Sequence, residues 1–175
     1  MSEPNDLSLY EDARDKADTG DCIVWNGVGL IPWLIRLMSP GANHTSTVYR
    51  MKETVKDRIL IMESMLKIGW DCNFLSQRLL KYRGQAMLLR LKDEYAPLRP
   101  QIGRLMMSDA LRTGYDLKGA IGNAIKPQPL GDTDNYCSES SIILYNSVGI
   151  TDIKIAIVPS AVAALPIFKE PIPLL

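Results

Sequence analysis

The chain has 175 residues, 46% of them apolar, which is enough for one globular domain with a substantial core. Its 20 basic and 20 acidic side chains balance, so no overall field would attract nucleic acid or an anionic membrane. Three scattered cysteines without a CxxC pair exclude a disulfide framework and a zinc motif, and they predict free thiols in a reducing compartment.

The first 18 residues form a polar lead-in without the basic and apolar regions of a secretory signal. They predict synthesis into the cytoplasm, and they leave open release by lysis or assembly into a particle. The longest apolar stretches, residues 23–38 and 153–165, are interrupted by Gly, Pro, Arg or Lys. They are shorter than a membrane span requires, so no transmembrane helix is expected.

The first half of the chain mixes short strand and helix patterns. The expected elements are a short helix at 7–14, a turn at 19–21, a buried strand at 22–25, a helix at 27–38, antiparallel strands at 44–51 and 58–62, and an amphipathic helix at 72–82.

The second half is predicted to contain a longer helix and a long loop. The expected elements are a strand at 85–91, a helix at 100–113, an exposed loop at 125–133, a helix beginning at Cys137, a strand or loop at 153–158, and an extended surface tail at 166–175.

Cys137 and His44 are the two residues whose chemical types and positions suggest a catalytic role. Cys137 opens a predicted helix, where unpaired N–H groups and the helix dipole favour the thiolate. His44 is the only histidine, and imidazole is the side chain best suited to exchange protons near neutral pH. Together they suggest a thiol nucleophile and its base, acting on an acyl carbon. The alternative is a polar strand-end histidine and a cysteine that packs as a small hydrophobe.

Such a pair needs an orienting group and donors for an oxyanion. Glu63 is the candidate for orienting His44, because it ends the strand expected to pair with the histidine strand; its alternative is an exposed strand-end glutamate. Glu139 ranks second, since it suits the N-terminus of the helix. The oxyanion donors would be the backbone N–H of Cys137 and the hydroxyl of Tyr115, whose alternative is an ordinary packed turn tyrosine.

The other two thiols are expected to be inert. Cys22 lies in the predicted buried strand, which favours a packing role. Cys72 is placed at a helix start, but it lies beside Trp70 and has no second histidine to serve it.

The motifs follow one another in a specific order along the chain. They are Thr19-Gly20-Asp21-Cys22-Ile23-Val24, Asn43-His44-Thr45-Ser46-Thr47-Val48, Ile61-Met62-Glu63-Ser64, Tyr115-Asp116-Leu117-Lys118-Gly119, Tyr136-Cys137-Ser138-Glu139 and Val158-Pro159-Ser160-Ala161. This order resembles the circularly permuted branch of the papain-like NlpC superfamily, especially the YiiX-like proteins, and more distantly lecithin retinol acyltransferase. In the unpermuted members the cysteine helix comes before the histidine, whereas here His44 precedes Cys137.

The resemblance implies an α+β fold in which a small, curved antiparallel sheet packs against the cysteine helix. It covers residues 19–168 as one permuted papain-like domain, between the lead-in at 1–18 and a Pro-rich tail at 169–175. It implies Cys137 as nucleophile, His44 as base, Glu63 as their polar partner and Tyr115 as the residue that assists the oxyanion. The implied activity is cleavage of a peptide, isopeptide or cell-wall amide bond through a thioester, with no metal and no cofactor.

Two alternatives follow from an apolar segment, residues 33–38, which begins with Trp33 and ends with Met38. As a lid or a lipid-facing wall, it would suit a lipid esterase or acyltransferase of the same fold. As a contact with a partner, together with the tail, it would suit a non-catalytic component of a larger assembly such as a virion.

Overall fold

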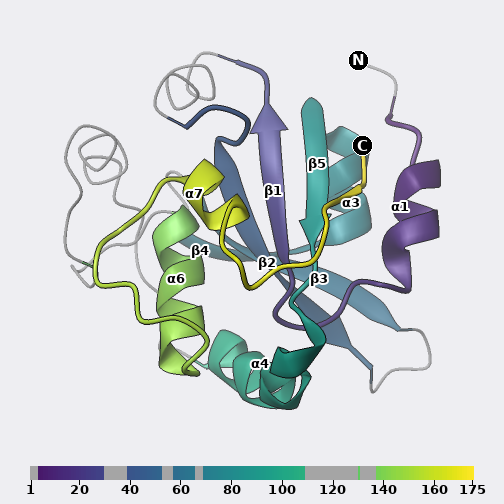
Figure 1. Ribbon diagram of the computed structural model, residues 1–175. Helices are drawn as coiled ribbons and strands as arrows, with labels where there is room; N and C mark the ends of the chain where they lie inside the picture. Colours follow the sequence, from purple (N-terminus) through teal and green to yellow (C-terminus); the bar gives the residue numbers. More distant parts are fainter. Residues whose placement is uncertain (1–3, 30–38, 53–56, 66–68, 109–129, 131–136) are drawn as a thin grey trace.

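The computed structural model describes residues 4–29, 39–52, 57–65, 69–108, 130 and 137–175. They form an α+β fold with an antiparallel sheet in the order β4-β3-β2-β1-β5-β6 (Figure 1). The strands are β1 (Cys22–Gly27), β2 (His44–Met51), β3 (Arg58–Met65), β4 (Gly69–Phe74), β5 (Gly84–Leu89) and β6 (Ile172–Pro173). The helices are α1 (Ser8–Arg14), α3 (Leu75–Lys81), the 3-10 helix η1 (Asp93–Leu98), α4 (Arg99–Met107), α6 (Cys137–Ser147) and α7 (Pro159–Ala163).

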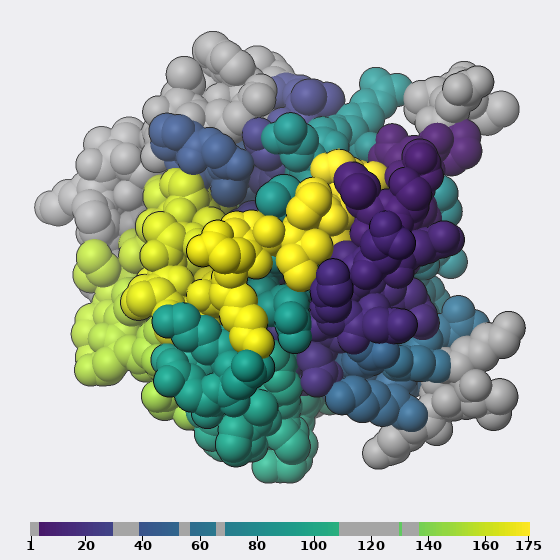
Figure 2. Space-filling model, turned by 45° about the vertical axis from the view of Figure 1, so that its right-hand side comes forward, coloured from purple at the N-terminus to yellow at the C-terminus, as the bar shows by residue number. Residues whose placement is uncertain are grey.

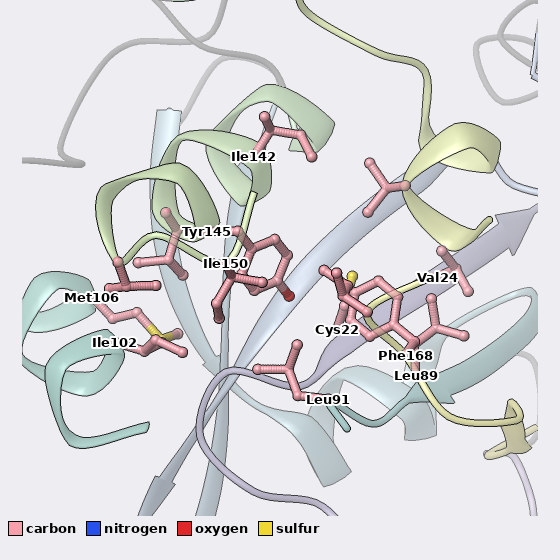
Figure 3. Close-up of a cluster of buried hydrophobic side chains, with 14 of the residues drawn as sticks. Cys22, Val24, Leu89, Leu91, Ile102, Met106, Ile142, Tyr145, Ile150 and Phe168 are labelled. Atoms are coloured by element: carbon pink, nitrogen blue, oxygen red, sulfur yellow. The ribbon is translucent and has the colours of Figure 1, made fainter. Parts of the chain in front are cut away.

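The sheet is covered on both faces, and side-chain alternation along β1 separates the two cores. Cys22 and Val24 point to the face covered by α4, α6 and α7, whereas Ile23 and Trp25 point to the face covered by α1 and α3. Figure 3 shows the first core, where Tyr145 of α6 lies close to the sheet. Its hydroxyl donates to the carbonyl of Gly20 at 3.0 Å.

The strands at 44–51 and 58–62 and their antiparallel pairing are confirmed, and β3 continues three residues further, to Met65. The helix expected at 72–82 is only partly right. Residues up to Phe74 pair with β3, with Cys72 opposite Met62, and the helix begins at Leu75. Cys72 is therefore a strand residue, contrary to the expectation that it opens a helix. Backbone pairing with β3 overrides the local pattern here.

Asp21 is a buried structural carboxylate that ties the start of β1 to two distant segments. Its Oδ1 accepts from the Leu91 backbone N–H at 3.0 Å and from Arg99 Nη1 at 2.8 Å. Burial raises the pKa of Asp21, and the Arg99 guanidinium opposes this rise. Before it, Gly20 adopts φ +90°, and a Cβ there would meet the Ile102 side chain at 2.8 Å. The Gly20-Asp21 turn therefore has a packing role.

The end of the chain lies in the sheet, contrary to the expected surface tail. Ile172 pairs with Leu88 of β5, and the Leu174 backbone N–H donates to the Ala86 carbonyl at 2.8 Å. Figure 2 shows this segment in yellow beside α1 in purple. Prolines are tolerated here because β6 is an edge strand, and Leu174 directly after it is buried.

Several expectations fall outside the described residues. They are residues 30–38 of the helix expected at 27–38, the end of the helix expected at 100–113 and most of the loop at 125–133. The start expected for the first of these helices is wrong, because Gly27 ends β1 and residues 28 and 29 are not helical. Residues 153–158 contain no strand longer than an isolated bridge, and a short helix starts at Pro159. None of the helices in the described part of the chain is both long and apolar enough to cross a bilayer.

Candidate active site

Cys137 is the first residue of α6, as the sequence predicts. The residue is 5% exposed, and hydrogen bonding by the backbone N–H groups of Thr45 and Ser138 helps to lower the pKa of its thiol. The helix is anchored to β2 through Ser141, whose hydroxyl lies 3.5 Å from the hydroxyls of both Thr45 and Thr47. The anchoring places the start of α6 at the end of β2 where His44 lies.

His44 and Glu63 meet side by side on neighbouring strands. His44 Nε2 lies 2.6 Å from Glu63 Oε2. The pairing of Thr47 with Met62 makes this possible, since it places Glu63 further along β3 in the direction of His44. Glu63 is 1% exposed and lies inside β3, so it is not the exposed strand-end residue of the alternative interpretation.

His44 also interacts with Cys137, as the mutual effect of the two groups on their pKa values indicates. Because Nε2 faces Glu63, the ring nitrogen left for the sulfur is Nδ1. Burial alone would lower the pKa of His44, but the charge and hydrogen bonds of Cys137 and Glu63 raise it to about 10. In the same way, burial opposes ionisation of Cys137, but His44 and the two backbone donors lower its pKa. These directions favour a thiolate–imidazolium pair.

Glu63 stays ionised because cations surround it. Burial would raise its pKa, but His44 and Arg78 together lower it to about 2. Arg78 Nε donates to Glu63 Oε1 at 3.0 Å, and its Nη2 lies 3.5 Å from Oε2. Asn73 Nδ2 adds a longer contact of 3.5 Å to Oε1. Both carboxylate oxygens therefore have donors.

Arg78 was not predicted from the sequence. It lies on α3, and its guanidinium stacks over the rings of Trp25 at 5.4 Å and Tyr82 at 5.3 Å. In the sequence it is one of several basic residues between positions 78 and 83, on the polar side of an amphipathic pattern. No local signal distinguishes it from Lys81 or Arg83, since its role depends on which strand the helix covers.

The remaining candidate residues differ in outcome. Tyr115 lies outside the described residues, and Glu139 is buried in the first turn of α6. Cys22 is fully buried in the core, and burial raises the pKa of its thiol. Cys72 is exposed on β4, and partial burial together with Asp71 raises its pKa. Among the three cysteines, the pKa is lowered only at Cys137.

Comparisons with known proteins show the fold alone. No protein-family model matches the chain, and no curated protein matches it in sequence. Its fold is similar to the crystal structure of YiiX, a metalloprotein from Escherichia coli O157:H7, with a TM-score of 0.61 and 16% identity. The match covers 87% of this chain and 94% of that chain. Within the described residues of this chain, no three His, Cys, Asp or Glu side chains are placed to hold a metal ion.

Proposed function

We propose that this chain, which shares the fold of the YiiX structure, is a thiol hydrolase of the circularly permuted papain-like type, with Cys137 as nucleophile, His44 as base and Glu63 as its partner. One observation carries the proposal: Nε2 of the only histidine lies 2.6 Å from a buried carboxylate, and the same ring interacts with Cys137 so that the pKa of the imidazole is raised and that of the thiol is lowered. A thiolate beside an imidazolium that a carboxylate orients is the arrangement that acyl transfer requires.

In the first half of the reaction, the Cys137 sulfur adds to an amide carbonyl carbon, and the carbonyl π electrons move to oxygen. The backbone N–H of Cys137, in the first turn of α6, faces no intrahelical acceptor and suits the oxyanion. The His44 imidazolium then gives its Nδ1 proton to the leaving nitrogen. The C–N bond breaks, which leaves a thioester and a neutral imidazole.

In the second half, His44 takes a proton from water, and the hydroxide adds to the thioester carbon. The C–S bond breaks, the acid product leaves, and the thiolate–imidazolium pair is restored. Glu63 stays ionised throughout, and it stabilises each imidazolium that forms and holds the ring in one orientation. The favoured substrate class, from the family resemblance, is a peptide, isopeptide or cell-wall amide.

The test uses the fact that the most exposed of the three thiols is not the one whose pKa is lowered. Cys72 is exposed and Cys137 is nearly buried, so accessibility alone predicts that Cys72 reacts first. We expect the opposite order with iodoacetamide at pH 7, and modification of Cys137 alone by a peptidyl acyloxymethyl ketone, each mapped by mass spectrometry. His44→Ala should remove the preference for Cys137 and leave the Cys72 rate unchanged as the internal control.

The same experiment separates the alternatives. Faster labelling of Cys72 in the wild-type chain would contradict the proposal and would favour a non-catalytic component of a larger assembly. Turnover of an acyl ester together with inertness toward amides would keep the nucleophile and assign a lipid esterase or acyltransferase instead.

A further inference from the structure

The Glu63 carboxylate has two oxygens with different partners. Oε2 faces His44 at 2.6 Å, and Oε1 faces Arg78 at 3.0 Å. We infer that Arg78 is a positioning residue of the proposed site, which keeps the Glu63 carboxylate ionised and turned toward His44; this inference rests on the proposed function.

Arg78 is itself held in place, which a positioning role requires. Its guanidinium lies over Trp25 and Tyr82, whose rings meet edge to face at 4.7 Å. The indole Nε1 of Trp25 donates to Ser46 Oγ at 2.8 Å. The planar guanidinium can stack on two rings and donate to a carboxylate at the same time. A lysine ammonium would keep the positive charge, but it would lose the rigid, planar set of N–H donors.

The charges around Glu63 make its ionisation depend on Arg78. Facing Glu63 are His44 from β2, Arg78 from α3 and Asn73 from β4, and Asp71 lies opposite it in the strand register. Asn73 Nδ2 also donates to Asp71 Oδ2 at 2.8 Å. Without Arg78, a buried carboxylate near a second carboxylate would have only one cation, and it would take up a proton at higher pH.

The single histidine makes this measurable. In a protein labelled with 15N-histidine, the only ring signals are those of His44, and the Nε2–H reports the state of Glu63. In the wild type we expect this signal to stay constant from neutral pH down to about pH 3. In Arg78→Gln it should change between about pH 3 and 5, as the carboxylate returns toward its ordinary range. In Arg78→Lys the signal should change at a pH between those of the wild type and of Arg78→Gln.

Arg58→Gln is the matched control. It removes one positive charge from β3, the strand that carries Glu63, but Arg58 lies over Phe74 and has no contact with Glu63 among those described. Its ring titration should overlay that of the wild type. If the titrations of Arg78→Gln and Arg78→Lys also overlay that of Arg58→Gln, the inference is wrong. Should Arg78→Gln fail to fold, the comparison of Arg78→Lys with Arg58→Gln decides.

A rate measurement completes the test. Loss of a charge-assisted hydrogen bond that orients Glu63 should slow alkylation of Cys137 at pH 7 about tenfold in Arg78→Gln and leave it unchanged in Arg58→Gln. An unchanged or faster rate in Arg78→Gln would overturn the positioning role. If Cys137 is unreactive in the wild type, the proposed function fails, and the ring titration still shows whether Arg78 controls Glu63.

Discussion

At the scale of single residues, the candidate site is a row of four groups whose favoured ionic forms alternate in charge: the Cys137 thiolate, the His44 imidazolium, the Glu63 carboxylate and the Arg78 guanidinium. Each ion is favoured by the next, which is why the pKa of His44 rises to about 10 while that of Glu63 falls to about 2. Removing one member therefore changes the others, and the four groups act as one unit.

The ionisation of Glu63 predicts an acid-dependent stability. Because its folded pKa is lowered from 4.5 to about 2, the stability it contributes is present above pH 4.5 and is lost as the pH falls through about 2. For this fully buried carboxylate the shift corresponds to about 3 kcal/mol. Urea unfolding of the wild type and of Glu63→Gln between pH 2.5 and 7 should give curves that converge toward low pH; parallel curves would contradict the assignment.

At the scale of elements, the geometry of the pair depends on how α6 lies on β2. Ser141, one turn after Cys137, is 2% exposed and fits between Thr45 and Thr47 of that strand. A small side chain at this position lets the helix approach the sheet closely. The distance between the sulfur and the ring therefore depends on packing one helical turn after Cys137, against the two threonines that follow His44 in β2.

A larger side chain at position 141 should disturb the candidate site without replacing any of its residues. Ser141→Leu is expected to cost about 1 to 3 kcal/mol of unfolding free energy, because the extra volume forces the helix away from β2. The same shift should move Cys137 from His44 and slow its alkylation at pH 7. Ser147→Leu, on the exposed side of the same helix, is the control and should leave both measurements near the wild type. Equal alkylation rates in the two variants would show that α6 is not positioned by Ser141.

At the scale of the whole molecule, segments from both ends of the described chain pack on the same face of the sheet. Tyr10 and Ala13 of α1 and Leu174 beside β6 belong to one core with Ile23 and Leu88. This core lies on the face opposite α6, so it supports the sheet without contributing to the cysteine helix. Stability and chemistry should therefore be separable in this region.

Leu174→Ala tests that separation. The side chain is 1% exposed, so its loss should lower the unfolding free energy by about 2 to 4 kcal/mol through the cavity it leaves. The alkylation rate of Cys137 should not change in the folded variant. Leu9→Ala, a truncation of a 45% exposed leucine on α1, should have little effect on either quantity. A wild-type melting temperature for Leu174→Ala would mean that the C-terminal segment does not belong to the core.

How far the sequence could be interpreted depended on the range of the interactions involved. The helix at Cys137, the strand at His44 and the antiparallel partner bearing Glu63 were all predicted, because each follows from a local pattern of apolar and β-branched residues or turn signals. The strand β4 and the pairing of β6 were missed. Both depend on backbone hydrogen bonds to another strand. The residues around Cys72 and Ile172 show no local pattern that indicates such pairing.

By itself, the sequence determined which side chains are available, one imidazole and three thiols, and it predicted the strands of Cys22 and His44 and the helix of Cys137. Only the tertiary structure decided which thiol lies beside the imidazole, that Glu63 is buried, and that Arg78 reaches it from α3. The physical reason is that ionisation depends on neighbours in space and on burial. Residues 44, 63, 78 and 137 become neighbours only when the sheet forms and the helices pack on both of its faces.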